Sequence, residues 1–128
     1  MTKLSLTKLT VVFLIIFAGG RPGFAAAPGC EEAQHACDAW CMKPAPSLNL
    51  PANFADLCTA ACAKGVSPCQ AATDKTAKCN QFLWTCQDAC PDVKHDRANN
   101  VYTEMSTGRK CLNSCYQGNL QCYDILKP

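Results

Sequence analysis

The residues that recur at helical spacing along this chain are its cysteines, which stand among mostly small and polar residues. They occupy positions 30, 37, 41, 58, 62 and 69, and then 79, 86, 90, 111, 115 and 122. Steps of seven and four residues return side chains to one side of a helix, whereas the period of two in a strand would scatter them over both faces. The pattern therefore predicts helices, each with one narrow cysteine stripe.

The two halves of the chain share one cysteine pattern, and each half is also a mirror of itself. Each reads C-x6-C-x3-C and then, after a spacer of sixteen or twenty residues, C-x3-C-x6-C. Gly65 and Gly118 stand at matching places, three residues after Cys62 and Cys115. The shared spacing predicts an internal duplication.

Mirrored stripes suit an antiparallel pair of helices, because steps that rise along one helix match steps that descend along the other. Packed helix axes lie about 8–10 Å apart, which brings facing Cα atoms within reach of a disulfide. We therefore expect three nested bridges in each half, although bridges between the halves would also fit the spacing. The expected pairs are Cys30–Cys69, Cys37–Cys62, Cys41–Cys58, Cys79–Cys122, Cys86–Cys115 and Cys90–Cys111.

Proline, glycine and asparagine mark the breaks between the expected helices. The segment 42–51 contains three prolines and is expected to be a loop, with Asn53 as the N-cap of the next helix. Gly65 is expected to end that helix, and Ser67-Pro68 to begin another as N-cap and N1. Cys69 then either completes the outer bridge from outside a regular ladder or pairs elsewhere.

The N-terminal segment has the parts of a secretory signal peptide. Basic residues precede an apolar run over 9–18, and the small residues Gly23 and Ala25 fit a cleavage site after Ala25. The run is shorter than the roughly 20 apolar residues that a membrane span needs. We therefore expect residues 1–25 to be a signal peptide of a secreted protein, or of a periplasmic one in a bacterium.

Composition agrees with an oxidising compartment. Twelve of the 128 residues are cysteine, a share typical of short secreted disulfide scaffolds. Without residues 1–25, 9 of the 12 basic side chains remain against all 10 acidic ones, a net charge of −1. A near-neutral chain lacks the basic footprint of nucleic-acid-binding proteins and the cationic face of lipid-binding helices. We expect neither nucleic acid as a partner nor stable membrane insertion.

The expected fold class is all-α. It consists of two tandem antiparallel helical hairpins, each with a nested three-disulfide ladder, which can pack as a four-helix unit. The first hairpin spans 26–69, a linker spans 70–78, and the second hairpin with a C-terminal tail spans 79–128.

The thiols also allow redox or metal chemistry. Thioredoxin-like exchange uses C-x2-C, a spacing that this sequence lacks. Cu(I) favours thiolate ligands, and the four C-x3-C pairs resemble those of the bacterial copper-storage proteins, which bind copper inside a four-helix bundle. That resemblance implies an alternative to the disulfide scaffold, an exported Cu(I)-storing bundle with free thiols.

Groups for catalysis are sparse. His35 and His95 stand singly and lack the spacing of a zinc site. The pair His95-Asp96 is similar to the His-Asp pair of secreted phospholipases, but the glycine-rich calcium loop of those enzymes is absent from the sequence. G-x-S-x-G is absent as well. We expect a protein that is not an enzyme and has no cofactor.

Recognition is then the expected role. Phe82 and Trp84 are expected in the core, whereas the stretch from Asp92 to Lys110, with turn formers at Asn99-Asn100 and Ser106-Thr107-Gly108, is expected to be a long contact loop. Aromatic residues and arginine anchor interfaces, and a cross-linked loop loses less entropy on binding. The candidate partner-binding residues are Trp40, Arg97, Tyr102, Met105, Arg109 and Lys110.

Helices paired through C-x3-C motifs, as at 37/41 and 58/62, occur in several known families. The pattern resembles the twin C-x3-C core of small mitochondrial import chaperones, plant helical-hairpin antimicrobial and protease-inhibitor peptides, and helical-hairpin toxins of scorpions and ribbon worms. In length and cysteine density it is also similar to the con-ikot-ikot toxins of cone snails, although their adjacent cysteine pairs are absent here.

These resemblances imply a secreted, toxin-like or signalling binding protein that acts on an extracellular receptor or ion channel. A protease inhibitor that presents Lys43 or Arg97 from a loop is a further alternative. The oligomeric state stays open.

Overall fold

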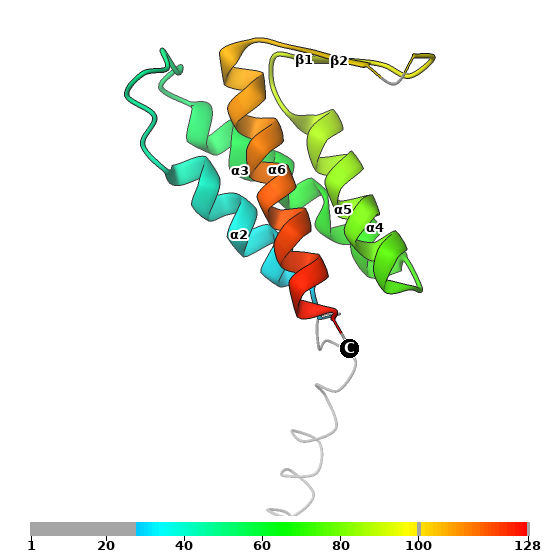
Figure 1. Ribbon diagram of the computed structural model, residues 1–128. Helices are drawn as coiled ribbons and strands as arrows, with labels where there is room; N and C mark the ends of the chain where they lie inside the picture. Colours follow the sequence, from blue (N-terminus) through cyan, green and yellow to red (C-terminus); the bar gives the residue numbers. More distant parts are fainter. Residues whose placement is uncertain (1–27, 100, 128) are drawn as a thin grey trace, which may run out of the picture.

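The computed structural model describes residues 28–99 and 101–127, and over 102–104 the backbone alone. It is mostly helical, with a short antiparallel ribbon between the last two helices (Figure 1). The expected signal peptide, residues 1–25, lies outside the described residues. The elements are α2 (Cys30–Met42), α3 (Phe54–Lys64), α4 (Val66–Ala71), α5 (Lys75–Ala89), β1 (Val93–Asp96), β2 (Val101–Glu104) and α6 (Ser106–Ile125).

All twelve cysteines are joined in six disulfides, and the pairs are those that the mirrored spacing predicts. Their Cα atoms lie 5.6–5.8 Å apart, and no cysteine is free. Positions that rise along α2 pair with positions that descend along α3, so these two helices run antiparallel, and α5 and α6 do the same. The bridges are Cys30–Cys69, Cys37–Cys62, Cys41–Cys58, Cys79–Cys122, Cys86–Cys115 and Cys90–Cys111.

Helix α3 ends before Gly65, as the sequence predicts, but α4 begins at Val66 rather than at Ser67-Pro68. Pro68 therefore stands in the first turn of α4, where a missing backbone N–H removes no helical hydrogen bond. The break turns Cys69 toward α2, so the Cys30–Cys69 bridge comes from a separate short helix.

Cystine, rather than large apolar side chains, fills the interior. No cysteine is more than 6% exposed, and Phe82, at 0%, is the largest fully buried side chain among the described residues. The expected burial of Trp84 is wrong, because its side chain is 52% exposed. Cys79, Phe82 and Cys86 share the inner face of α5, and two residues beyond Phe82 is about 200° round a helix, on the outer face.

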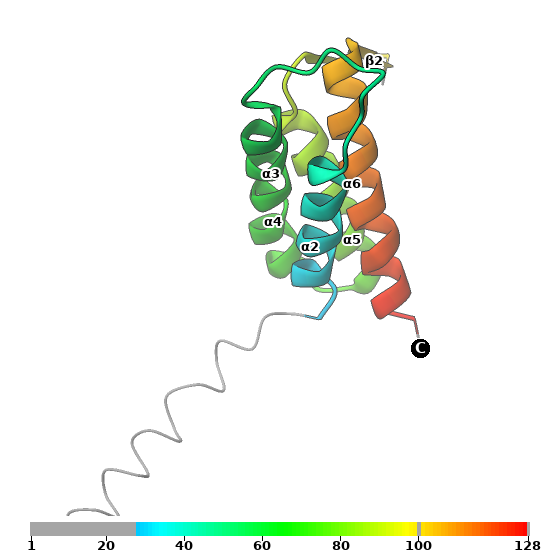
Figure 2. The ribbon, with the colours of Figure 1, turned by 90° about the vertical axis from the view of Figure 1, so that its left-hand side faces the viewer.

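Two glycines close the core around Phe82. A Cβ on Gly65 would lie 2.7 Å from Cδ2 of the Phe82 ring, and a Cβ on Gly118 would lie 2.6 Å from Cε1 of the same ring and 2.5 Å from the carbonyl oxygen of Ala33. These distances are too short for any side chain, so glycine lets α6 approach both α2 and α5. The most extensive helix contact is between α2 and α6, which bring the two ends of the described chain side by side (Figure 2).

The structure is mostly helical, as expected, but the expected long loop from Asp92 to Lys110 is wrong, because a short β-ribbon and the start of α6 occupy most of this stretch. Val93 to Asp96 pairs in antiparallel register with Val101 to Glu104, and α6 begins at Ser106. Residues Ser106-Thr107-Gly108, expected to form a turn, lie in the first turn of α6. Gly108 is required there because a Cβ would lie 2.5 Å from the carbonyl oxygen of Asp92, where the chain enters the ribbon.

Candidate functional site

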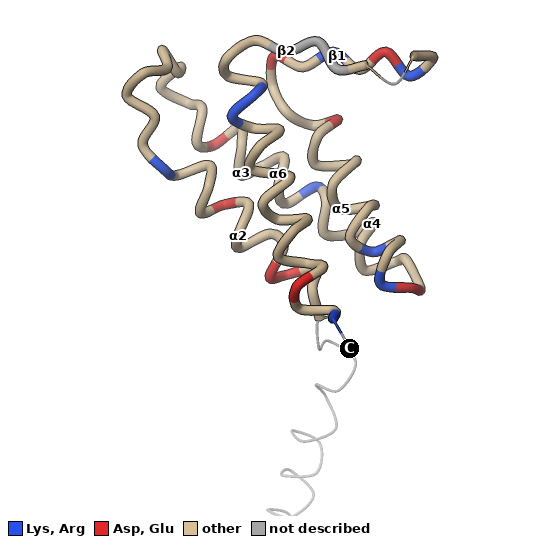
Figure 3. Tube along the Cα trace, in the orientation of Figure 1, with Lys and Arg blue, Asp and Glu red and all other residues tan. Residues whose placement is uncertain are grey.

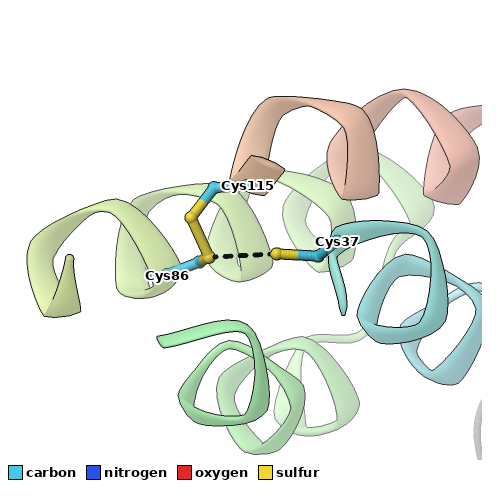
Figure 4. Close-up of side chains that lie close together, drawn as sticks. All are labelled: Cys37, Cys86 and Cys115. Atoms are coloured by element: carbon cyan, nitrogen blue, oxygen red, sulfur yellow. Dashed lines mark hydrogen bonds between the residues drawn. A yellow bond between two sulfur atoms is a disulfide. The ribbon is translucent and has the colours of Figure 1, made fainter. Parts of the chain in front are cut away.

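Four disulfides form a continuous line of sulfur atoms through the bundle, here called the sulfur row. Three non-bonded contacts of 3.5–3.6 Å connect these bridges in series. At the central contact, Cys37 of α2 points at the Cys86–Cys115 bridge between α5 and α6 (Figure 4). Bridged sulfurs carry no proton, so the contact is of van der Waals type. In order, the bridges are Cys58–Cys41, Cys62–Cys37, Cys86–Cys115 and Cys90–Cys111.

The sulfur row can support thiol–disulfide exchange or soft-metal binding, and each needs an open bridge. A thiolate exchanges with a disulfide that it can reach, and thiolates are the sulfur ligands of Cu(I). Among the described residues, three groups of three cysteine sulfurs lie within 4.8 Å of one another. With every cysteine bridged, the sulfurs hold the helices together and leave no thiolate for either reaction.

A pocket of about 290 Å³ lies where the end of α2 meets the start of α6. Figure 3 shows basic residues just after the end of α2 and near the start of α6, at the same end of the bundle. One wall comes from α2 and the loop after it, and the other from α6. The lining residues are Trp40, Lys43, Pro44, Ala45, Leu48, Ser106, Arg109, Lys110 and Asn113. The pocket therefore combines an aromatic and aliphatic wall with three cationic side chains.

Lys110 ties the two walls together. Its Nζ donates to the carbonyl oxygens of Trp40, at 3.0 Å, and Lys43, at 2.9 Å. The last carbonyls of a helix lack intrahelical partners and carry the negative end of its dipole, so an ammonium suits this place. Partial burial, followed by the nearby charge of Lys43, holds the pKa of Lys110 below its usual value.

Lys43 contributes a second ammonium to the same pocket. Its Nζ lies 4.0 Å from the centre of the Trp40 ring, at the distance of a cation–π contact. The segment with three prolines forms a loop, as expected, and its one lysine, Lys43, folds back over the Trp40 ring of α2. Because the Lys43 side chain is exposed, its charge remains available to a bound molecule.

Of the predicted contact residues, the structure brings Trp40, Arg109 and Lys110 together in the pocket. Met105 precedes α6 and is 70% exposed, but it does not line the pocket. Arg97 lies at the other end of the ribbon, where its guanidinium pairs at 3.3 Å with Asp88 of α5. Tyr102 lies in β2 opposite His95, and its side chain is outside the described part of the chain.

His95 and Asp96, neighbours in the sequence, face different groups. His95 Nδ1 lies 3.4 Å from a carboxylate oxygen of Asp88, whereas the carboxylate of Asp96 accepts hydrogen bonds from the backbone N–H groups of Ala98 and Asn99 and from the Asn99 side chain. These bonds, led by the Asn99 side chain, lower the pKa of Asp96. The carboxylate that lies within ion-pair distance of His95 is thus that of Asp88 in α5, and not that of its sequence neighbour Asp96.

Five residues that line the pocket were not among the candidates from the sequence, namely Pro44, Ala45, Leu48, Ser106 and Asn113. A local signal was present for the pairing of Lys43 with Trp40, because residues three apart lie on the same side of a helix end. The signal for Asn113 could not be found without the long-range approach of α6 to α2.

Comparisons with protein-family models, curated proteins and solved structures find no match for this chain. Within the part of the chain that the structure describes, no helix has both the length and the apolar character needed to cross a bilayer.

Proposed function

We propose that this chain is a secreted, non-enzymatic binding protein, toxin-like or signalling, that acts on an extracellular receptor or ion channel. The observation that carries the proposal is the complete pairing of twelve buried cysteines in six bridges. Such a set of bridges persists in an oxidising compartment outside the cell. Because the interior consists of cystine, binding falls to the side chains displayed on the outside.

The proposal includes the finer architecture, two tandem disulfide-laddered hairpins that arose by duplication and pack as one four-helix unit. Each bridge closes a loop and restricts the unfolded chain, at about 3 kcal/mol for a loop of 15 residues. Nested bridges restrict the same segments, so their contributions are smaller in sum. The loop after α2 and the ribbon are both displayed at one end of this stapled unit (Figure 1).

Saturable binding to intact cells tests the proposal. Fluorescently labelled residues 26–128, refolded with six bridges, are expected to bind excitable cells saturably, to be displaced by unlabelled protein, and to lose binding when the cells are first treated with a protease. The reduced and alkylated chain is the control, and it is expected not to bind. Binding that never saturates, or that the alkylated chain shares, would contradict the proposal.

The close sulfur groups favour a second candidate, an exported Cu(I) store that works with open bridges. Intact mass of the natively exported protein separates the two functions. Six bridges lower the mass by about 12 Da relative to the reduced chain, because each bridge removes two hydrogens. The binding protein is expected to show the lower mass, and the copper store the higher mass and twelve titratable thiols.

A further inference from the structure

We propose that the sulfur row forms a covalent cross-link between the two halves of the molecule, residues 30–69 and 79–122, when one of its bridges is reduced. Opening the bridge at one end of the row lets the remaining three bridges move along it by one sulfur. The middle bridge of the new set, Cys37–Cys86, joins the halves. This cross-link lies in the core, so it is independent of the exposed side chains that carry the proposed binding function.

Bonds and close contacts alternate along the whole row. The bonded pairs of sulfurs are separated by three contacts of 3.5–3.6 Å. A disulfide bond is about 2.05 Å long, so each contact becomes a bond when its two sulfurs approach by roughly 1.5 Å. In order along the row, the sulfurs belong to Cys58, Cys41, Cys62, Cys37, Cys86, Cys115, Cys90 and Cys111.

The middle contact is the one of the three that crosses between the halves. Sγ of Cys37 on α2 lies 3.6 Å from Sγ of Cys86 on α5 (Figure 4). Both residues are fully buried, so the two sulfurs are packed against each other in the core. The other two contacts each lie within one half. A shift of the bridges by one sulfur therefore changes a molecule without bridges between its halves into one with a single such bridge.

Reduction is expected to begin at Cys90, which at 6% is the most exposed cysteine; every other cysteine is at most 2% exposed. A dithiol reductant attacks Cys90 and releases Cys111 as a thiolate, which takes up a proton. The second thiol then closes the reductant into a cyclic disulfide and leaves Cys90 as a thiolate. Cys90 is the C-cap of α5, and negative charge is disfavoured beside the last carbonyls of a helix, which favours further reaction.

From Cys90 the exchange follows the row, and every step makes one S–S bond and breaks one. The Cys90 thiolate attacks Cys115, at 3.6 Å, and releases Cys86. The Cys86 thiolate attacks Cys37, also at 3.6 Å, and releases Cys62. This second step forms the bond between the halves.

A third step completes the exchange at the far end of the row. The Cys62 thiolate attacks Cys41, at 3.5 Å, and releases Cys58, which takes up a proton. Cys41 lies in the last turn of α2, whereas Cys58 lies away from the terminal carbonyls of α3, so Cys58 is the better leaving group. In sum, one dithiol is oxidised to a disulfide, and one bridge is replaced by two thiols, at Cys58 and Cys111.

One equivalent of dithiothreitol tests the cross-link. Residues 26–128, with a specific protease site inserted between Thr73 and Asp74, are refolded with six bridges and treated at about pH 8, where the reductant is partly ionised. The sample is quenched with acid, labelled with N-ethylmaleimide in acidic denaturant and then cut. Untreated protein is expected to give two separate halves on a non-reducing denaturing gel, and treated protein a band of joined halves. Peptide mapping is expected to find the Cys37–Cys86 bond in that band, with the labels on Cys58 and Cys111.

A pair of variants tests the row without any reductant. Cys111→Ser leaves Cys90 as a thiol at the end of the row, so its halves are expected to be joined, with the free thiol on Cys58. Cys122→Ser is the matched control, because it leaves Cys79, whose bridge lies outside the row, and its halves are expected to separate. Helical circular dichroism checks the folding of both variants. The dithiothreitol experiment needs no cysteine substitution, so it decides the outcome if a variant does not fold.

Separate halves after treatment, with one bridge shown to be open, would overturn the proposal, and so would separate halves in a folded Cys111→Ser variant. Joined halves in the Cys122→Ser variant, or bonds between the halves that include Cys30, Cys69 or Cys79, would also overturn it, because they would show unspecific shuffling. Cell binding is measured with the fully bridged protein. If the cross-link does not form while cell binding persists, the proposed binding function stands.

Discussion

At several positions in this protein the choice of residue is explained by close packing rather than by helix propensity, and Gly118 is the clearest case. It lies inside α6, where alanine would ordinarily stabilise a helix by about 1 kcal/mol over glycine. A Cβ there would lie 2.5 Å from the Ala33 carbonyl oxygen and 2.6 Å from the Phe82 ring. The helix-forming preference and the packing therefore make opposite predictions for one substitution.

We expect Gly118→Ala to destabilise the protein by about 2 kcal/mol, since overpacking forces side chains and backbone apart. Guanidinium unfolding with bridges intact measures the change. Gly65→Ala is expected to behave in the same way, because its Cβ would meet the opposite side of the same ring. A gain of stability in both variants would show that helix propensity, rather than close packing of Gly65 and Gly118 against the Phe82 ring, governs these positions.

The contacts in the sulfur row predict that, when one cysteine is left unpaired, successive thiol–disulfide exchanges transfer the free thiol from one cysteine to the next along the row. Cys58→Ser leaves Cys41 as a thiol, 3.5 Å from the sulfur of Cys62. Attack by its thiolate forms Cys41–Cys62 and releases Cys37, which can attack Cys86 in turn, and every step makes one S–S bond and breaks one. Acid quenching, denaturation, alkylation and peptide mapping are expected to find labels on Cys37 and Cys115 as well as on Cys41.

A matched control is available at the other end of α2. Cys69→Ser frees Cys30, which belongs to a bridge outside the sulfur row. Its label is expected to stay on Cys30 after the same incubation. Labels confined to Cys41 in the first variant, or equally scattered labels in both, would show that exchange does not follow the row.

At the scale of elements, the ribbon of β1 and β2 is the part that the cysteine pattern could not predict. Its strands are only four residues each, and Asn99-Asn100 within a turn-rich stretch indicates a turn without saying what the turn connects. The carboxylate of Asp96 organises that turn through the Asn99 side chain and two backbone N–H groups.

Asn99→Ala is expected to raise the pKa of Asp96 toward its ordinary value, because the side-chain hydrogen bond is the largest cause of the lowering. A carboxyl group with a lowered pKa in the folded state stabilises the ribbon above its ordinary pKa. That contribution is lost as pH falls through the lowered value. Carboxyl ¹³C shifts measured against pH test the change, with Lys94→Ala as a control that leaves the turn intact. An unchanged pKa would assign the lowering to the backbone N–H groups.

For the whole molecule, the sequence predicted the pairing of cysteines better than the packing of the halves. Steps of seven and four residues specify a face and a mirror partner, and the six bridges are the mirrored pairs, although the spacing alone also allowed bridges between the halves. The approach of α2 to α6 depends on the close packing of Gly118 against Phe82 and α2. This packing joins segments far apart in the sequence, so the spacing of residues along the chain could not predict it. The pocket shares that origin, since its walls lie some seventy residues apart in the chain, as the Lys110–Trp40 hydrogen bond shows.

Cutting the chain between the halves tests how they are held. Residues 72–74 join α4 to α5, no bridge crosses from 30–69 to 79–122, and yet α2 packs most extensively on α6. With a specific protease site inserted between Thr73 and Asp74, the cut halves are expected to elute together in native gel filtration and to separate on a denaturing, non-reducing gel. One band on that gel, with the cut confirmed after reduction, would mean that bridges cross between the halves. Separation already in native buffer would mean that the cystine core of each half is sufficient by itself, and that Phe82 and its two glycines do not hold the molecule together.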